Sequence, residues 1–364
     1  MVRQVARGAL ALALLAFVLD SSGSGRQQPA APDKVYYRDA KTKIPAASPV
    51  VGELKAGPGG FQIVSGTAVK MTVSPADIVK VVLNADLPGV DKNNSNQAQA
   101  DEDKADWGNA LKKYGDLKAA AVAKNAPEKS RRFLEYKVAT TTARVADDTP
   151  DDAGWKEKAE AAAKELGQFL VAYPTGWEIW SVGRTTARIQ SELGKYREAS
   201  QTWARVAKAA DLPADLKQEA ALQEIDALIR GKQYPDAAAR IAEAAKAAPA
   251  GSVKDRLAIY QIVAKAAETA APADAVAPIE AEVGKTKDPL TRAVGYAMIG
   301  ELYLAAGKPR EAMWAVLWVE TVYNHDRDEV AKALHRLGDI FKAQGDEERA
   351  KGYAEKLRRY RGTL

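Results

Sequence analysis

Residues whose side chains could do chemistry are scarce in this sequence. The 364-residue chain contains no cysteine and only two histidines, His325 and His335. This composition excludes disulfides, thiolate catalysis and zinc–sulfur sites, and it leaves little material for a histidine-dependent triad or a multi-histidine metal site. Asp326 and Asp328 stand near His325 as they would at a metal site, but the same pattern is typical of a polar turn between two helices. We favour the turn, and we expect no metal and no cofactor.

The familiar catalytic motifs are also missing. The sequence has no Gly-x-Ser-x-Gly, no His-Glu-x-x-His, no EF-hand spacing and no Walker-type phosphate loop. Gly57-Pro58-Gly59-Gly60 lacks the Lys-Ser/Thr pair of a phosphate loop and precedes a β-prone run, so we interpret it as a hairpin turn. The acidic runs Asp101-Glu102-Asp103 and Asp147-Asp148 are predicted to be solvated loops. No residue is assigned a catalytic role, and we expect a protein that is not an enzyme.

Two further groups of side chains allow either a binding or a structural role. Trp177 and Trp180 stand three residues apart on one predicted helix face, where they could stack on a ligand or lie in the core, and we favour the core. The last predicted helix is basic, which would suit phosphate binding, but a polar outer face on a capping repeat explains it better. Its basic residues are Arg349, Lys351, Lys356, Arg358, Arg359 and Arg361.

Composition places the chain among ordinary globular proteins. Hydrophobic residues make up 46% and charged residues 28% of the sequence, and the net charge is +5. This excess of positive charge is too small to indicate a nucleic-acid partner.

The N-terminus has the layout of a secretory signal. Two arginines precede the uncharged residues 8–19, a run that is shorter than the ~20 residues needed to span a bilayer. We predict a signal peptide over residues 1–25 and a flexible leader over 26–33, with an uncleaved membrane anchor as the alternative. The mature chain is expected to be exported, to be periplasmic or associated with the cell envelope, and to have no transmembrane segment.

Residues 34–83 differ from the rest of the chain in their β-prone runs. Short runs rich in β-branched and aromatic residues occur at 35–37, 50–54, 61–64, 69–73 and 78–83. Five such strands predict a small SH3- or Sm-like β module, a β-barrel or curled sheet. The polar residues 84–103 are predicted to be a linker or an irregular first repeat.

Residues 104–362 are dominated by good helix formers and contain a repeat. A small residue precedes an acidic or polar residue and then alanine, and these alanines fall 37 or 38 residues apart. The repeat positions are Gly194, Ala199, Gly231, Ala237, Ala275, Gly307, Ala312, Gly345 and Ala350. One repeat length of 38 residues before Ala199 lies Ala161. The next possible copy, at Ala110, is 51 residues further back, and an insertion around 147–153 could account for the gap.

Two copies resemble the tetratricopeptide repeat. Ile299-Gly300, Tyr303, Gly307 and Ala312 reproduce that family's Leu-Gly…Tyr…Gly…Ala pattern, and Leu337-Gly338, Phe341, Gly345 and Ala350 do so again. The resemblance covers roughly residues 105–360 and implies a mainly α fold, an α-solenoid of helix hairpins behind the N-terminal β module. The whole chain resembles exported tetratricopeptide-repeat proteins of planctomycete-type bacteria that carry a β-rich N-terminal module, which implies the periplasm or cell envelope.

The side chains fit this interpretation. Gly307 can end a helix in the left-handed conformation, and Pro309 suits the first turn of the next helix. Ala312 and Ala350 are predicted to lie where two helices cross closely, with Tyr303 and Phe341 filling the gap on the facing helix.

One predicted helix, over 312–323, is apolar around nearly its whole circumference, so we expect it to be buried on every side, under the β module or a second subunit. Its apolar residues are Met313, Trp314, Val316, Leu317, Trp318, Val319, Val322 and Tyr323.

Three functions remain open from the sequence. The first is a non-enzymatic protein–protein interaction scaffold, in which the concave groove of the solenoid receives a peptide or helix of a partner protein. The second is a structural envelope component that forms a homo-oligomer through its repeats or through the helix at 312–323. The third, an enzyme that holds a glycan along the groove, has no paired carboxylates in a recognisable motif to support it.

Overall fold

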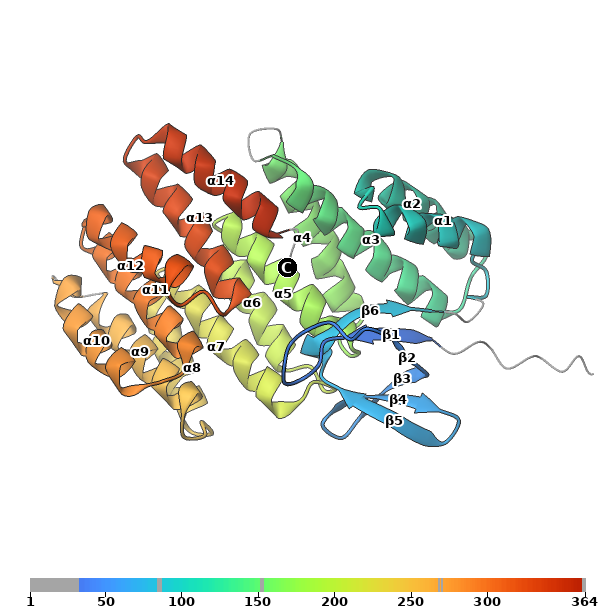
Figure 1. Ribbon diagram of the computed structural model, residues 1–364, viewed down its shortest axis with the longest axis horizontal. Helices are drawn as coiled ribbons and strands as arrows, with labels where there is room; N and C mark the ends of the chain where they lie inside the picture. Colours follow the sequence, from blue (N-terminus) through green and yellow to red (C-terminus); the bar gives the residue numbers. More distant parts are fainter. Residues whose placement is uncertain (1–32, 84–86, 151–153, 268, 270, 362–364) are drawn as a thin grey trace, which may run out of the picture.

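The computed structural model describes residues 33–83, 87–150, 154–267, 269 and 271–361 (Figure 1). The predicted signal peptide and all of the predicted leader except Asp33 lie outside the described residues.

The N-terminal module contains six strands in two three-stranded antiparallel sheets, ordered β2-β1-β6 and β3-β4-β5. The predicted turn joins β3 to β4, since Gly57 pairs with Gly60. The sheets are not joined into a closed barrel. The elements are β1 (Lys34–Tyr37), β2 (Val50–Val51), β3 (Glu53–Gly57), β4 (Gly60–Ser65), β5 (Ala68–Val73), the 3-10 turn η1 (Pro75–Asp77) and β6 (Ile78–Val82).

The run at 50–54 was predicted as one strand, but Gly52 divides it between the two sheets. The Gly52 N–H donates to the Asp33 carbonyl at 2.9 Å. A Cβ at this position would lie 2.7 Å from the carbonyl oxygen of Val64, so only glycine lets the chain pass this close to β4.

The rest of the described chain is helical. Residues 84–103 were predicted to be a linker or an irregular first repeat, and the linker interpretation does not hold for 92–103, which form a helix, α1, that begins after the N-cap Asp91. The helices are α1 (Lys92–Asp103), α2 (Trp107–Ala123), α3 (Glu128–Asp148), α4 (Trp155–Ala172), α5 (Glu178–Glu192), α6 (Tyr196–Ala207), α7 (Ala214–Arg230), α8 (Tyr234–Ala245), α9 (Ser252–Ala266), the 3-10 turn η2 (Pro272–Ala275), α10 (Val276–Lys285), α11 (Pro289–Ala305), α12 (Pro309–Thr321), α13 (Arg327–Ala343) and α14 (Glu347–Arg361).

Consecutive helices form hairpins that stack side by side, as in an α-solenoid (Figure 1). The predicted register holds from α5 onward, and Ala199, Ala237, Ala275, Ala312 and Ala350 are all buried. It fails in α4, where Ala161 is exposed and Ala159 and Ala162 are buried instead. The early hairpin is longer because α3 has 21 residues and α4 has 18.

The turns inside the hairpins use the left-handed conformation. Gly194, Gly307 and Gly345 have φ of +74°, +69° and +75°. Gly231 departs from this pattern with φ of −80°, and Lys232 takes the left-handed position with φ of +57°. This copy is one residue longer in the sequence, which moves the turn by one position.

Glycines within helices mark close crossings. A Cβ on Gly300 would lie 2.7 Å from a methyl group of Val316 on α12, so these two helices touch through the glycine. The equivalent Gly338 has room, since its nearest neighbour would be Tyr353 Cβ at 3.8 Å. Tyr303 is half-buried and Phe341 is buried, where it stacks on Tyr353 with 5.4 Å between ring centroids.

The helix at 312–323 is not buried on every side within this chain, so cover by the β module is excluded, while cover by a second subunit stays a prediction. Trp314, Trp318 and Val322 are 57%, 45% and 44% exposed, and they form a stripe along the outer face of α12. The β module does not cover them. Tyr296 of α11 stacks on Trp318 and on Tyr323, with ring centroids 5.4 and 5.3 Å apart.

The last hairpin returns to the first half of the array. α14 contacts α3, and Figure 1 shows the red C-terminal helices beside the green ones. Helix α13 forms ion pairs with α5 and α7. In the part of the chain that the structure describes, no helix combines the length and apolar character needed to cross a membrane.

Candidate partner-binding cleft

A cleft of about 400 Å³ lies between the β module and the helices. Its walls come from η1 and β6, from α1 and α3, and from α5, while Asp328 of α13 lies at one side. The module is seated by η1, which contacts α5, and by Trp177, which joins the module's apolar core. The cleft is therefore the space that remains between the β module and the helical surface beside these contacts.

Charged side chains join α1 to α3 in the wall of the cleft. Lys137 is buried and donates to Glu102 at 2.6 Å and to Gln99 at 3.3 Å. Burial lowers the pKa of Lys137, although Glu102 opposes this. Asp101 pairs with Lys113 at 2.6 Å. The run 101–103 was predicted to be a solvated loop, but it is helical and two of its carboxylates anchor α1.

The second acidic run is solvated only in part, because Asp148 is exposed and Asp147 is not. Asp147 is buried at the end of α3 and accepts two hydrogen bonds of 2.8 Å from Arg188. Arg188 also pairs with Glu192 at 3.2 Å. Burial disfavours the charged guanidinium, but these two carboxylates outweigh it and raise the pKa of Arg188.

The residues around His325 form a turn and a helix cap. Asp326 accepts from the backbone N–H groups of Asp328 and Glu329 at 2.9 Å, which caps α13. Asp328 accepts two hydrogen bonds of 2.6 Å from Arg184 on α5. His335 lies elsewhere, with its Nε2 3.1 Å from the Glu192 carbonyl oxygen. Among the described residues, no three acidic or histidine side chains are grouped to hold a metal ion.

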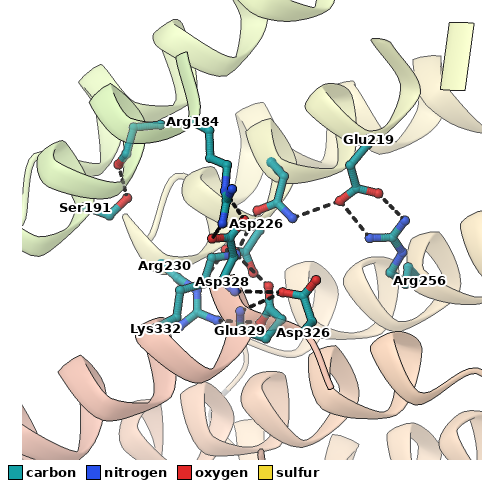
Figure 2. A network of polar contacts seen from close by, with 12 residues as sticks. Arg184, Ser191, Glu219, Asp226, Arg230, Arg256, Asp326, Asp328, Glu329 and Lys332 are labelled. Carbon is teal, nitrogen blue, oxygen red and sulfur yellow. Dashed lines mark hydrogen bonds and ion pairs between the residues drawn. The ribbon is translucent and has the colours of Figure 1, made fainter. Parts of the chain in front are cut away.

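Beyond the cleft, the charges continue as a buried network, and Figure 2 shows the part of it that joins α7 to α13. Lys332 donates to Asp226 at 3.0 Å and to Glu329 at 2.7 Å. Arg230 donates to Asp226 at 2.9 Å and to Glu301 at 3.2 Å. The cavity inside this network measures about 60 Å³, which has room for water but not for a polypeptide segment.

The network shifts the pKa values of Asp226 and Glu329 in opposite directions. Burial opposes the charged form of Asp226, but Arg230 and Lys332 outweigh it and lower its pKa to about 2. Burial raises the pKa of Glu329, and repulsion from Asp226 adds to the effect. Ion pairs thus occupy most of the space between these helices, whereas the cleft has the larger volume.

The basic C-terminal helix does not present all its charges to solvent. Arg361 is only 1% exposed, pairs with Glu192 at 2.8 Å and lies over the Trp155 ring at 4.7 Å. Arg349 and Arg359 are exposed; Arg349 pairs with Asp346 just before α14, and Arg359 pairs with Glu355 within it. The predicted polar capping face therefore holds for part of the helix, while its end docks on α5.

The two tryptophans have separate roles. Trp180 is buried and contacts Trp203, with ring centroids 5.7 Å apart, as predicted for a core residue. Trp177 is half-buried and contacts Tyr136 at 5.2 Å between centroids. It lies between the β module and α3 rather than within the helical core.

Two basic residues of the cleft were not singled out in the sequence. Arg38 and Arg144 line it and have no carboxylate partner among the described residues. Arg144 lies over the Trp107 ring at 5.9 Å and donates to the Arg361 carbonyl at 3.4 Å. Burial lowers the pKa of Arg38, and repulsion from Arg184 adds to this.

Comparisons with known proteins give similarity at the level of helical architecture. No protein-family model matches the sequence, and no curated protein matches it. The chain is similar to the crystal structure of a tetratricopeptide repeat protein from Parabacteroides merdae, with 15% identity, a TM-score of 0.42, and coverage of 74% of this chain and 97% of that one. It is also similar to BtubC from P. vanneervenii, with 14% identity, a TM-score of 0.27, and coverage of 57% and 90%.

Proposed function

We propose that this protein is a non-enzymatic interaction scaffold of the cell envelope that holds a segment of a partner protein in the cleft. The observation that carries this proposal is the cleft itself, whose volume of about 400 Å³ lies in the usual range for binding sites. Its walls combine arginine with the aromatic side chains of Trp107, Tyr136 and Trp180, which are the residue types that dominate the binding energy of interfaces.

The export of the chain is part of the same proposal. It rests on the basic start and the short apolar run at residues 8–19. We propose that the protein is not an enzyme because each carboxylate that lines the cleft pairs with a lysine or arginine of the described chain. These are Glu102, Asp103, Asp147 and Asp328.

A variant that fills the cleft tests this function. Thr185 lines the cleft on α5, and Thr185→Trp would occupy it. Ala242, exposed on α8, supplies the control Ala242→Trp. Immobilised wild-type protein and the control are expected to retain the same protein from envelope extract, while Thr185→Trp with an unchanged circular dichroism spectrum loses it. Retention by all three proteins would contradict the proposal.

A second candidate function, self-association, is favoured by the exposed stripe on α12. Trp314, Trp318 and Val322 follow one another at intervals of four residues, so they lie along one line of the helix. Two copies of such a stripe can face each other in a symmetric dimer.

A further inference from the structure

The strand that lines the cleft lies at the edge of its sheet. The order β2-β1-β6 leaves β6 paired on one side only, and Ile78 to Val81 line the cleft. The Ile78 N–H donates to the Pro75 carbonyl. No other backbone hydrogen bond joins the outer edge of β6 to a described segment. The unpaired edge of β6 therefore lies beside the cleft, with one irregularity in its pairing opposite Tyr36 and Tyr37, and a further strand would lie about 4.8 Å away.

The side chains of β6 fit an added strand. Val79 is apolar yet 47% exposed, and it lines the cleft. Lys80 pairs with Asp103 of α1 at 2.6 Å and so bridges β6 and α1. The opposite wall presents Thr140 of α3 and Ser181 of α5, small polar side chains that leave room for an extended chain.

The excess of basic side chains in the cleft favours an acidic ligand. Six basic residues line it against four acidic ones, and four of the basic residues pair with those acids. Arg38 and Arg144 are the two that remain; Arg184 and Arg327 add positive charge around Arg38, and Asp77 offsets part of it. A guanidinium binds a carboxylate through two parallel hydrogen bonds.

We propose that a partner polypeptide binds in the cleft as an extended strand added to β6, with acidic side chains directed to Arg38 and Arg144. This inference rests on the proposed function and specifies its partner. An acidic peptide fits better than a nucleic acid, because the open edge of β6 can pair with the main-chain N–H and C=O groups of a polypeptide, which a phosphate backbone lacks.

Short labelled peptides test the binding mode. The probe is a fluorescein-labelled hexapeptide that alternates valine and glutamate, measured by fluorescence anisotropy. Two matched peptides carry either glutamine for glutamate or N-methyl groups on alternate backbone nitrogens. We expect both changes to weaken binding by about tenfold or more, because glutamine loses the charge and the paired oxygens of the carboxylate, and N-methylation removes main-chain N–H donors. A thymidine hexanucleotide is expected not to bind, and its binding in place of the peptide would overturn the proposal.

Variants of the protein locate the contact. Arg38→Gln with Arg144→Gln is expected to weaken the glutamate peptide by about tenfold or more. Lys246→Gln with Lys254→Gln removes the same charge from exposed positions on α8 and α9 and is expected to leave binding unchanged. Val79→Glu is expected to abolish binding, while Val171→Glu, at an exposed valine on α4, does not.

Hydrogen exchange separates this inference from the proposed function. Bound peptide is expected to slow amide exchange in β6 but not in β5, the edge strand of the other sheet. An N-methylated peptide that binds as tightly, or β6 exchange that does not slow, would overturn strand addition. If strand addition is overturned but Thr185→Trp still blocks capture of the partner from extract, the scaffold function stands without strand addition. If capture is also unaffected, both fail.

Discussion

At the scale of single residues, two glycines that look equivalent in the sequence have different surroundings. Gly300→Ala would place a Cβ 2.7 Å from a methyl group of the buried Val316. Gly338→Ala would meet its nearest neighbour at 3.8 Å, an ordinary contact. We expect Gly300→Ala to destabilise the protein by about 1–3 kcal/mol through overpacking. Gly338→Ala should be neutral or stabilising by up to about 1 kcal/mol, because alanine favours helix. Urea denaturation measures both, and equal effects would contradict the crossing geometry.

Asp226 makes stability depend on acid pH. Its pKa in the folded protein is lowered from 3.8 to about 2, so the stability it contributes is complete above about pH 4 and is lost as the pH falls toward 2. Asp226→Asn should make the free energy of unfolding depend less on pH between about pH 4 and pH 2. It should also reduce stability at pH 7 by about 3 kcal/mol, since Arg230 and Lys332 lose a buried partner.

Glu329 provides the internal control for this prediction. Its pKa is raised, so its contribution has the opposite sign and declines as the pH rises above its ordinary value of 4.5. Glu329→Gln should therefore change the denaturation profile above about pH 4.5 and leave the acid limb in place. An acid limb that survives Asp226→Asn would show that other groups produce it.

At the scale of elements, α1 is held mainly by polar contacts, because Ala98 is its only buried residue. Glu102→Gln leaves Lys137 without its charged partner in a buried position, which should cost about 3 kcal/mol. We expect faster amide exchange across α1 while exchange in α13 is unchanged. Asp103→Asn, which removes an exposed carboxylate from the same turn, serves as the comparison.

The exposed stripe on α12 predicts association that depends on concentration. If two copies pair through it, the mass from light scattering should rise with concentration for the wild type. Trp314→Lys should keep the protein monomeric without loss of stability, because Trp314 is 57% exposed. Val122→Lys, on α2, is the matched change at another exposed apolar site. A constant mass at all concentrations would remove self-association as a function.

These elements also indicate what the sequence can and cannot predict. The helical register from α5 onward and the turn at Pro58-Gly59 follow from local patterns, since each depends on residues within one repeat. The exposure of Trp314 and the burial of Asp147 depend on which distant helices lie beside them. Arg184 and Asp328 are 144 residues apart, and no local spacing marks them as partners. The cleft was missed for the same reason, because it forms only where the β module, α1 and α5 meet.

At the scale of the whole molecule, ion pairs fasten the last hairpin to the first half of the array. Arg184 joins α5 to α13, and Arg361 joins α14 to α5. Arg184→Gln with Arg361→Gln should loosen this closure and increase the radius of gyration measured by small-angle X-ray scattering. Arg349→Gln removes an exposed pair with Asp346 at the start of α14 and should not change the radius of gyration. An unchanged radius in the double variant would show that these two ion pairs are not needed for the closure.

The claim that the cleft receives a partner protein is tested most directly by photo-crosslinking in the native cell. A photoreactive phenylalanine at position 185 lies in the cleft, and one at position 242 lies on the exposed face of α8. We expect one protein to be crosslinked through position 185 and not through position 242. The crosslinked peptide should be acidic, and the crosslink should be lost in the Arg38→Gln/Arg144→Gln background. The same set of crosslinks at both positions, or none at position 185, would contradict it.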